Sequence, residues 1–85
     1  MARYFFDFHD VQLTTRDEEG TECADREAVL AEAMRALCQI AEDHPDRYVD
    51  GTLRVAVRDA SDRTVLTASI NLSAAWHADE EQQAA

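Results

Sequence analysis

The sequence predicts an α+β fold: an antiparallel four-stranded sheet with one amphipathic helix packed on one face, in the order β-β-α-β-β. One observation behind this prediction is a run of apolar residues with helical spacing in the middle of the chain. The other is the alternation of apolar and polar residues on either side of that run, which is typical of half-buried strands. The 85 residues leave room for a single small core. We therefore expect one domain over residues 1–73 and an acidic, flexible tail over residues 74–85.

The N-terminal part predicts two strands that lie beside each other. In the first, from Arg3 to His9, alternate residues point to opposite faces, and only Phe5 breaks the pattern by lying on the polar side. Asp10 to Gln12 forms the reversal, and Leu13 to Asp17 forms a short second strand. Asp17 to Gly20 is then typical of a β-turn, with Asp at its first position and Gly at its last.

A single helix is predicted from Asp25 to Asp43. Asp25 is a good N-cap, because its carboxylate can accept hydrogen bonds from the first free backbone amides. Pro45 disfavours helical geometry at the residue before it, so it marks the end of the helix, and we expect no second helix. The apolar residues of the helix fall within an arc of roughly 140° that should pack on the sheet, with Leu37 near its middle. They are Val29, Leu30, Ala33, Met34, Leu37, Ile40 and Ala41.

The second half of the chain predicts a β-hairpin. Asp50-Gly51 is a turn dipeptide, and Thr52 to Asp59 after it has the clearest alternation in the chain. Ala60 to Arg63 is a short polar reversal, after which Thr64 to Leu72 alternates again. The face that the helix should cover consists of Tyr4, Phe6, Leu53, Val55, Val57, Leu66, Ala68 and Ile70.

The composition is strongly acidic, with 18 Asp and Glu against 8 basic residues, all of them Arg, and a net charge of −10. This balance argues against nucleic-acid binding, since contacts with phosphates would be repulsive overall, and it favours basic protein partners. No apolar run is long enough for a signal peptide or a membrane-spanning helix. We therefore expect a cytoplasmic protein that binds neither nucleic acid nor membranes.

No motif for catalysis, a cofactor or a metal rises above background. The acidic run from Asp17 to Glu22 could attract a divalent cation, but consecutive acids lack the alternating spacing of a calcium loop, so a solvated turn is favoured. The spacing of Cys23 and Cys38 favours free thiols over a disulfide, with Cys38 partly buried. Surface or capping roles are favoured for His9, His44 and His77. We expect no enzyme, no cofactor and no small-molecule substrate.

Several motifs occur in a recognisable order: Ala2-Arg3-Tyr4-Phe5-Phe6-Asp7, then Asp17-Glu18-Glu19-Gly20-Thr21-Glu22, an Ala-rich helix and Arg63-Thr64-Val65-Leu66-Thr67. Together they resemble a family of small bacterial domains of unknown function, common in rhizobia and methylobacteria, over roughly residues 2 to 68. The resemblance implies the same order of elements and a bacterial cytoplasmic setting, and it brings no activity. This chain differs at Asp10 to Gln12, where members often have a Gly-rich reversal, and at Arg16, where they often have Pro.

The sheet face turned away from the helix carries the candidate interaction site. Phe5, Arg54 and Arg58 lie on it, and aromatic and Arg residues are favoured at protein interfaces. We expect these three residues to anchor a binding or self-association surface. An ordinary solvated face is the alternative, since one wet face is normal for antiparallel sheets.

The sequence thus favours a small protein-interaction module that forms a homo-oligomer, most simply a homodimer, because a folded unit of this size has little net stability by itself. Pairing of strand edges is a competing route to a dimer. The alternative function is regulation of a nucleic-acid-binding protein, as an antitoxin-like protein or an acidic mimic of nucleic acid. The sequence does not indicate which partner is bound, whether the run from Asp17 to Glu22 has a role, or whether Trp76 docks on the domain.

Overall fold

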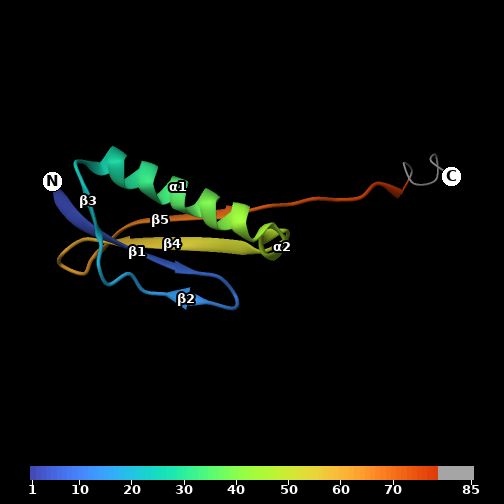
Figure 1. The fold of residues 1–85 in the computed structure, drawn as a ribbon, viewed down its shortest axis with the longest axis horizontal. Helices are drawn as coiled ribbons and strands as arrows, with labels where there is room; N and C mark the ends of the chain where they lie inside the picture. Colours follow the sequence, from blue (N-terminus) through green and yellow to red (C-terminus); the bar gives the residue numbers. More distant parts are fainter. Residues whose placement is uncertain (79–85) are drawn as a thin grey trace.

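The computed structural model describes residues 1–78 and shows the predicted α+β architecture. The long helix α1 (Arg26–Asp43) lies along one face of an antiparallel sheet (Figure 1). The sheet has the strand order β2-β1-β4-β5, and β3 also pairs with β1. The strands are β1 (Ala2–His9), β2 (Thr14–Thr15), β3 (Thr21–Cys23), β4 (Thr52–Arg58) and β5 (Thr64–Asn71). The predicted order of elements is therefore confirmed, with one strand added before the helix.

The added strand β3 makes the sheet five-stranded, so the prediction of four strands is wrong. β2 pairs with Phe8 and His9, whereas β3 pairs with the other end of β1, from Ala2 to Tyr4. The residues between β2 and β3 leave the ladder and include Gly20, whose φ is 77°. Glycine adopts this left-handed conformation without steric cost, so the chain can turn here and then pair with β1 a second time.

The helix begins as predicted, with Asp25 as its N-cap: Asp25 Oδ1 accepts a hydrogen bond from the Ala28 N–H at 2.8 Å. The prediction of a single helix is wrong, because α2 (Pro45–Tyr48) follows α1 directly. Proline is tolerated in the first turn of a helix, where its missing N–H is not needed. Pro45 therefore ends one helix and begins another. In residues 1–78 no helix is both long and apolar enough to cross a membrane.

The hydrophobic core lies between α1 and the sheet. Leu37 is 1% exposed, as predicted for the middle of the apolar arc. Leu30 and Met34 also belong to that arc but are 46% and 41% exposed, so their predicted burial is wrong. The helix packs through a row of every fourth residue, and these two side chains lie beside that row. The buried residues are Phe6, Cys23, Val29, Ala33, Leu37, Ala41, Tyr48, Leu53, Val55 and Val57.

Both cysteines are free thiols, as favoured by their spacing. Their environments differ from the prediction, because Cys23 is buried and Cys38 is exposed instead of partly buried. Cys23 ends the short strand β3, which the sequence pattern did not reveal. Its burial raises the pKa of its thiol, which makes it a weak nucleophile near neutral pH.

The chain after β5 leads away from the sheet (Figure 1). Trp76 is 92% exposed there, so it does not dock on its own domain. The predicted flexible tail over residues 74–85 falls in part on residues 79–85, which lie outside the described residues.

Candidate functional site

The guanidinium of Arg58 dominates the open face of the sheet, the face turned away from α1. Arg58 Nε donates to Asp7 Oδ2 at 2.6 Å, and Nη2 donates to Asp7 Oδ1 at 3.1 Å. Nη2 also donates to the Asp17 carbonyl oxygen at 2.9 Å, and Nη1 donates to Asp62 Oδ1 at 2.9 Å. Arg58 Cζ lies 5.0 Å from the centroid of the Phe5 ring. One side chain thus connects β1, β4, the acidic turn and the β4–β5 hairpin.

Asp17 organises the acidic turn between β2 and β3. Its Oδ2 accepts a hydrogen bond from the Phe6 N–H at 3.1 Å, and its Oδ1 accepts from the N–H groups of Glu19 and Gly20, both at 3.1 Å. The Asp17 N–H donates to Asp7 Oδ1 at 2.9 Å. The turn is therefore held against the sheet by side chains. We name Phe5, Asp7, Asp17 and Arg58 the Arg58 network.

The network lowers the pKa of both carboxyl groups. For Asp7 the main cause of the lowered pKa is the hydrogen bond from Arg58. For Asp17 burial acts to raise the pKa, but hydrogen bonds from backbone amides, first that of Gly20, outweigh it and the pKa is lowered. The pKa of Arg58 is raised in turn, chiefly by its hydrogen bond to Asp7. Carboxylates with a lowered pKa are poor general bases near neutral pH, so the arrangement favours a structural role over acid–base catalysis.

Gly20 brings the acidic turn against β1. A Cβ at this position would lie 2.8 Å from Arg3 Cγ and 2.9 Å from Phe5 Cε2, and the φ of Gly20 is positive. We expect Gly20→Ala to lower the free energy of unfolding by about 1–2 kcal/mol, because the new side chain is strained and crowded. Urea denaturation measures the loss, with Glu18→Ala, an exposed position in the same turn, as the control. Equal effects of the two substitutions would contradict this account of Gly20.

A second polar contact secures the reversal between β1 and β2. The Tyr48 hydroxyl donates to Asp10 Oδ2 at 2.7 Å, and the Tyr48 residue is 1% exposed. Asp10 Oδ1 accepts hydrogen bonds from the Gln12 and Leu13 N–H groups, both at 2.8 Å. The Asp10 side chain thereby organises a turn that contains no glycine. This contact, like the Arg58 network, holds the fold together.

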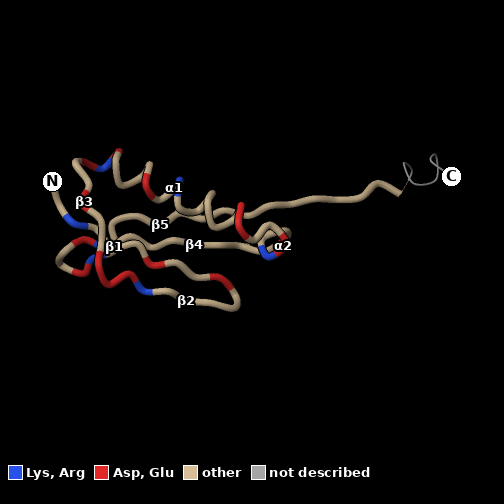
Figure 2. Tube along the Cα trace, in the orientation of Figure 1, with Lys and Arg blue, Asp and Glu red and all other residues tan. Residues whose placement is uncertain are grey.

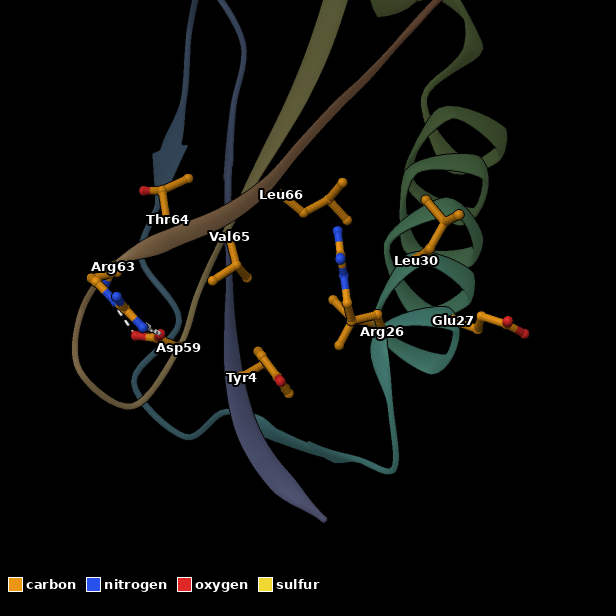
Figure 3. A pocket seen from close by; sticks show the side chains of 10 residues that line it. Tyr4, Arg26, Glu27, Leu30, Asp59, Arg63, Thr64, Val65 and Leu66 are labelled. Carbon is orange, nitrogen blue, oxygen red and sulfur yellow. Dashed lines mark hydrogen bonds and ion pairs between the residues drawn. The ribbon is translucent and has the colours of Figure 1, made fainter.

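A groove of about 720 Å³ opens between the first turns of α1 and the start of β5 (Figure 3). Its walls are largely apolar, with Tyr4 from β1, Leu30 from α1 and Leu66 from β5. At its rim, Arg63 Nη2 lies 3.4 Å from Asp59 Oδ2. The residues that line the groove include the charged Arg26 and Glu27 of α1, and no His or Cys. Its chemistry suits an apolar side chain from another protein.

Apolar surface is exposed along this side of the domain. Leu30, Met34 and Val65 are 46%, 41% and 45% exposed, and we name them the apolar flank. Leu30 and Val65 both line the groove, and Met34 follows Leu30 by one helical turn. Single exposed apolar residues are ordinary, whereas neighbouring ones are typical of interaction surfaces.

The residues predicted as interaction anchors fall into two environments. Phe5 and Arg58 contact each other within the Arg58 network, and only 12% of the Arg58 side chain is exposed. Arg54 lies opposite His9 in β1 and Ser69 in β5, and it is exposed. The structure therefore brings two of the three together and gives them an intramolecular role. That any of them contacts a partner stays a prediction.

Sequence reasoning missed Asp7 and Asp17 as partners of Arg58. The alternation in β1 and β4 places Asp7 and Arg58 on the same face, and this signal could have suggested their pairing. The contact itself depends on the register, in which Phe5 lies opposite Arg58 and Asp7 opposite Ala56. Asp17 is partly buried, unlike the exposed Glu18 and Glu19 beside it. The interpretation of the whole acidic run as a solvated turn is therefore wrong for Asp17.

Comparison with known proteins adds a family and no activity. In residues 1–78 no group of three or more His, Cys, Asp or Glu side chains is placed to hold a metal ion. A family model described as a domain of unknown function, DUF6894, matches residues 3–71, which include both helices and all of the strands except the first residue of β1. No curated protein and no solved structure matches the chain. The resemblance to a family of unknown function is confirmed, whereas its occurrence in rhizobia and methylobacteria stays a prediction.

Proposed function

Because the chain belongs to DUF6894, a family of domains of unknown function, we propose its role from its surfaces: a non-catalytic protein-interaction module that associates with a second copy of itself. The proposal places the protein in the cytoplasm, bound to neither nucleic acid nor membranes. It requires no cofactor and no small-molecule substrate.

The apolar flank is the observation that carries this proposal. A domain of this size needs its apolar side chains in the core, yet Leu30 and Met34 leave more than a third of their surface in water. Burial of such side chains against a partner removes apolar surface from water, which favours association by about 25 cal/mol per Å² before the entropic cost of association is subtracted. The polar clusters favour no catalytic role, because their carboxylates are engaged in holding turns and strands.

Regulation of a basic, nucleic-acid-binding protein is the alternative proposal. Acidic residues gather along the turn between β2 and β3 (Figure 2), where Glu18 and Glu19 are exposed, and Glu22 is exposed in β3 itself. With a net charge of −10, this surface would attract a basic partner. The charge is a weaker argument than the apolar flank, because an acidic surface also serves solubility alone.

Sedimentation equilibrium of the full chain over a range of concentrations tests the proposal. We expect a mass of two copies at high concentration and of one copy after dilution. In parallel, the immobilised chain is exposed to cell lysate, and the retained proteins are identified. Selective recovery of basic nucleases or repressors without self-association would support the alternative. A chain that is monomeric throughout and retains no protein would contradict both.

A further inference from the structure

The two sides of the sheet end differently. On the β1 side lie only β2 and β3, strands of two and three residues, with the acidic turn between them. On the other side lies β5, eight residues long and paired only with β4 in the described part of the chain. Short strands and charges are the usual protection of a sheet edge against pairing with another chain. β5 lacks both kinds of protection, because it is long and contains no charged residue (Figure 2). It also contains no proline.

The backbone groups that point outward from β5 follow from the pairing. The Phe6 N–H donates to the Asp17 carboxylate, which lies on the β2 side of β1. This N–H therefore points away from β4. Successive residues of a strand direct their backbone groups to opposite edges. The paired residues of β1, β4 and β5 carry this alternation across the sheet. It directs the backbone N–H and C=O groups of Ala68 toward β4. Thr67 and Ser69 therefore direct their N–H and C=O groups to the open edge.

Leu30 and Met34, the two residues of the apolar flank that belong to α1, lie on the side of the helix that faces β5. Leu30 shares the groove with Val65 and Leu66 of β5. Arg26 and Glu27, which have opposite charges, line the same groove at the first turn of α1, whereas Glu32 lies on the other side of the helix, beside a second cavity formed with β1 and β2. The uncharged edge of β5 and the neighbouring Leu30 and Met34 thus form a surface on which the charges of Arg26 and Glu27 balance, in a protein whose net charge is −10.

We infer that a second copy of this chain binds here, with β5 of each copy paired antiparallel across a two-fold axis. The inference rests on the proposed self-association and assigns its surface. A register centred on Ala68 places Thr67 opposite Ser69 of the second copy, so outward backbone groups meet outward groups. On the helix side it places Leu66 opposite Ile70 of the second copy, an apolar pair. The β5 edge satisfies the requirement of a two-fold interface, which is that one surface is complementary to itself.

The size of this contact fits a weak dimer. An eight-residue strand is about 26 Å long, and a sheet layer with a helix layer is about 20 Å thick, so roughly 500 Å² could be covered on each copy. The total of about 1,000 Å² is near the lower limit of specific interfaces. The dimer should therefore dissociate on dilution.

The open face is less suited to this contact. Its Arg58 guanidinium is already bound to Asp7 and Asp62, so it has few donors left for a partner. Charge repulsion between two acidic copies is smallest where neither copy carries charge, and this condition holds along β5. A strand from a different protein would also fit the edge; the wild type would then sediment as a monomer, contrary to the inference.

Sedimentation equilibrium of full-length variants tests the assignment. Ser69→Pro removes an N–H that faces the open edge, where an edge strand tolerates proline, and it blocks pairing. We expect a folded protein, checked by circular dichroism, whose dimer dissociation constant is at least about tenfold higher than that of the wild type. Met34→Glu is a second, independent variant with the same expected result, because it places one charge from each copy near the two-fold axis.

Two controls keep the outcome specific. Ala31→Glu adds the same charge at an exposed position on the outer side of α1, and Arg54→Glu changes the open face; both variants should remain dimers. If folded Ser69→Pro and Met34→Glu proteins keep the dimer mass, or if Arg54→Glu abolishes it, the β5 edge is not the interface and only this inference is overturned. If the wild type is a monomer at all concentrations, the inference and the proposed self-association both fail.

Discussion

Leu37→Ala should lower the free energy of unfolding by about 2–5 kcal/mol, the largest loss that we expect from one substitution. Leu37 is 1% exposed and belongs to the row of α1 that packs on the sheet. The substitution removes buried methyl groups and leaves a cavity that the surrounding side chains fill only in part. A domain of this size has roughly 4–12 kcal/mol of total stability, so a large share would be lost. Urea denaturation followed by circular dichroism measures the change.

Leu30→Ala is the matched control, because it changes the same residue type in the same helix. Leu30 is 46% exposed, so its truncation should cost less than about 1 kcal/mol when the chain is monomeric. Both variants are measured at concentrations low enough to prevent association. Equal losses at the two positions would mean that α1 faces the sheet through a different row of residues.

The parts of the fold that could be predicted are those in which one local pattern determines the result. In β4, Leu53, Val55 and Val57 are buried, as the alternation requires, because a strand on a sheet with one covered face has no other way to bury its apolar side chains. Asp25 was predicted as an N-cap from chemistry within one helical turn, and its hydrogen bond to Ala28 lies within that turn. Local sequence is sufficient for both.

The remaining features depend on contacts between distant parts of the chain. Tyr48 is buried in the core, and its hydroxyl donates a hydrogen bond to Asp10, which is far away in the sequence. β3 exists because Gly20 and the Asp17 carboxylate turn the chain back onto β1. Neither partner can be identified from a residue and its neighbours alone.

The candidate site shows the same division. The pattern placed Phe5, Arg54 and Arg58 on one face, and the strands are indeed arranged so. It could not show that Arg58 is engaged by Asp7, since this depends on strand register. The exposure of Met34 depends on the orientation of the helix on the sheet. That orientation is determined by the packing of many side chains at once. The β5 edge became a candidate surface only when the strand order was known.

Acid should destabilise the protein through the Arg58 network. The pKa of Asp7 is lowered in the folded state by its hydrogen bond from Arg58, and that of Asp17 is also lowered, although burial opposes this. A carboxyl group with a lowered folded-state pKa contributes stability that is fully present above its unfolded-state pKa of about 4. That contribution is lost as the pH falls through the lower folded-state pKa. The melting temperature should therefore fall as the pH drops below about 4, and it should level off once both groups are protonated in the folded state as well.

Asp7→Ala tests whether this network is responsible. It leaves Arg58 without its main partner, so we expect a loss of about 2–3 kcal/mol at neutral pH. This is less than for a fully buried pair, because 21% of the Asp7 side chain and 12% of the Arg58 side chain remain exposed to screening solvent. The stability of the variant should also depend less on pH in the acid range, since one of the carboxyl groups that must be protonated is absent. Glu42→Gln, at an exposed position of α1, should keep the wild-type stability and pH dependence. An Asp7→Ala protein as stable and as acid-sensitive as the wild type would mean that Arg58 and Asp7 do not hold the acidic turn on the sheet.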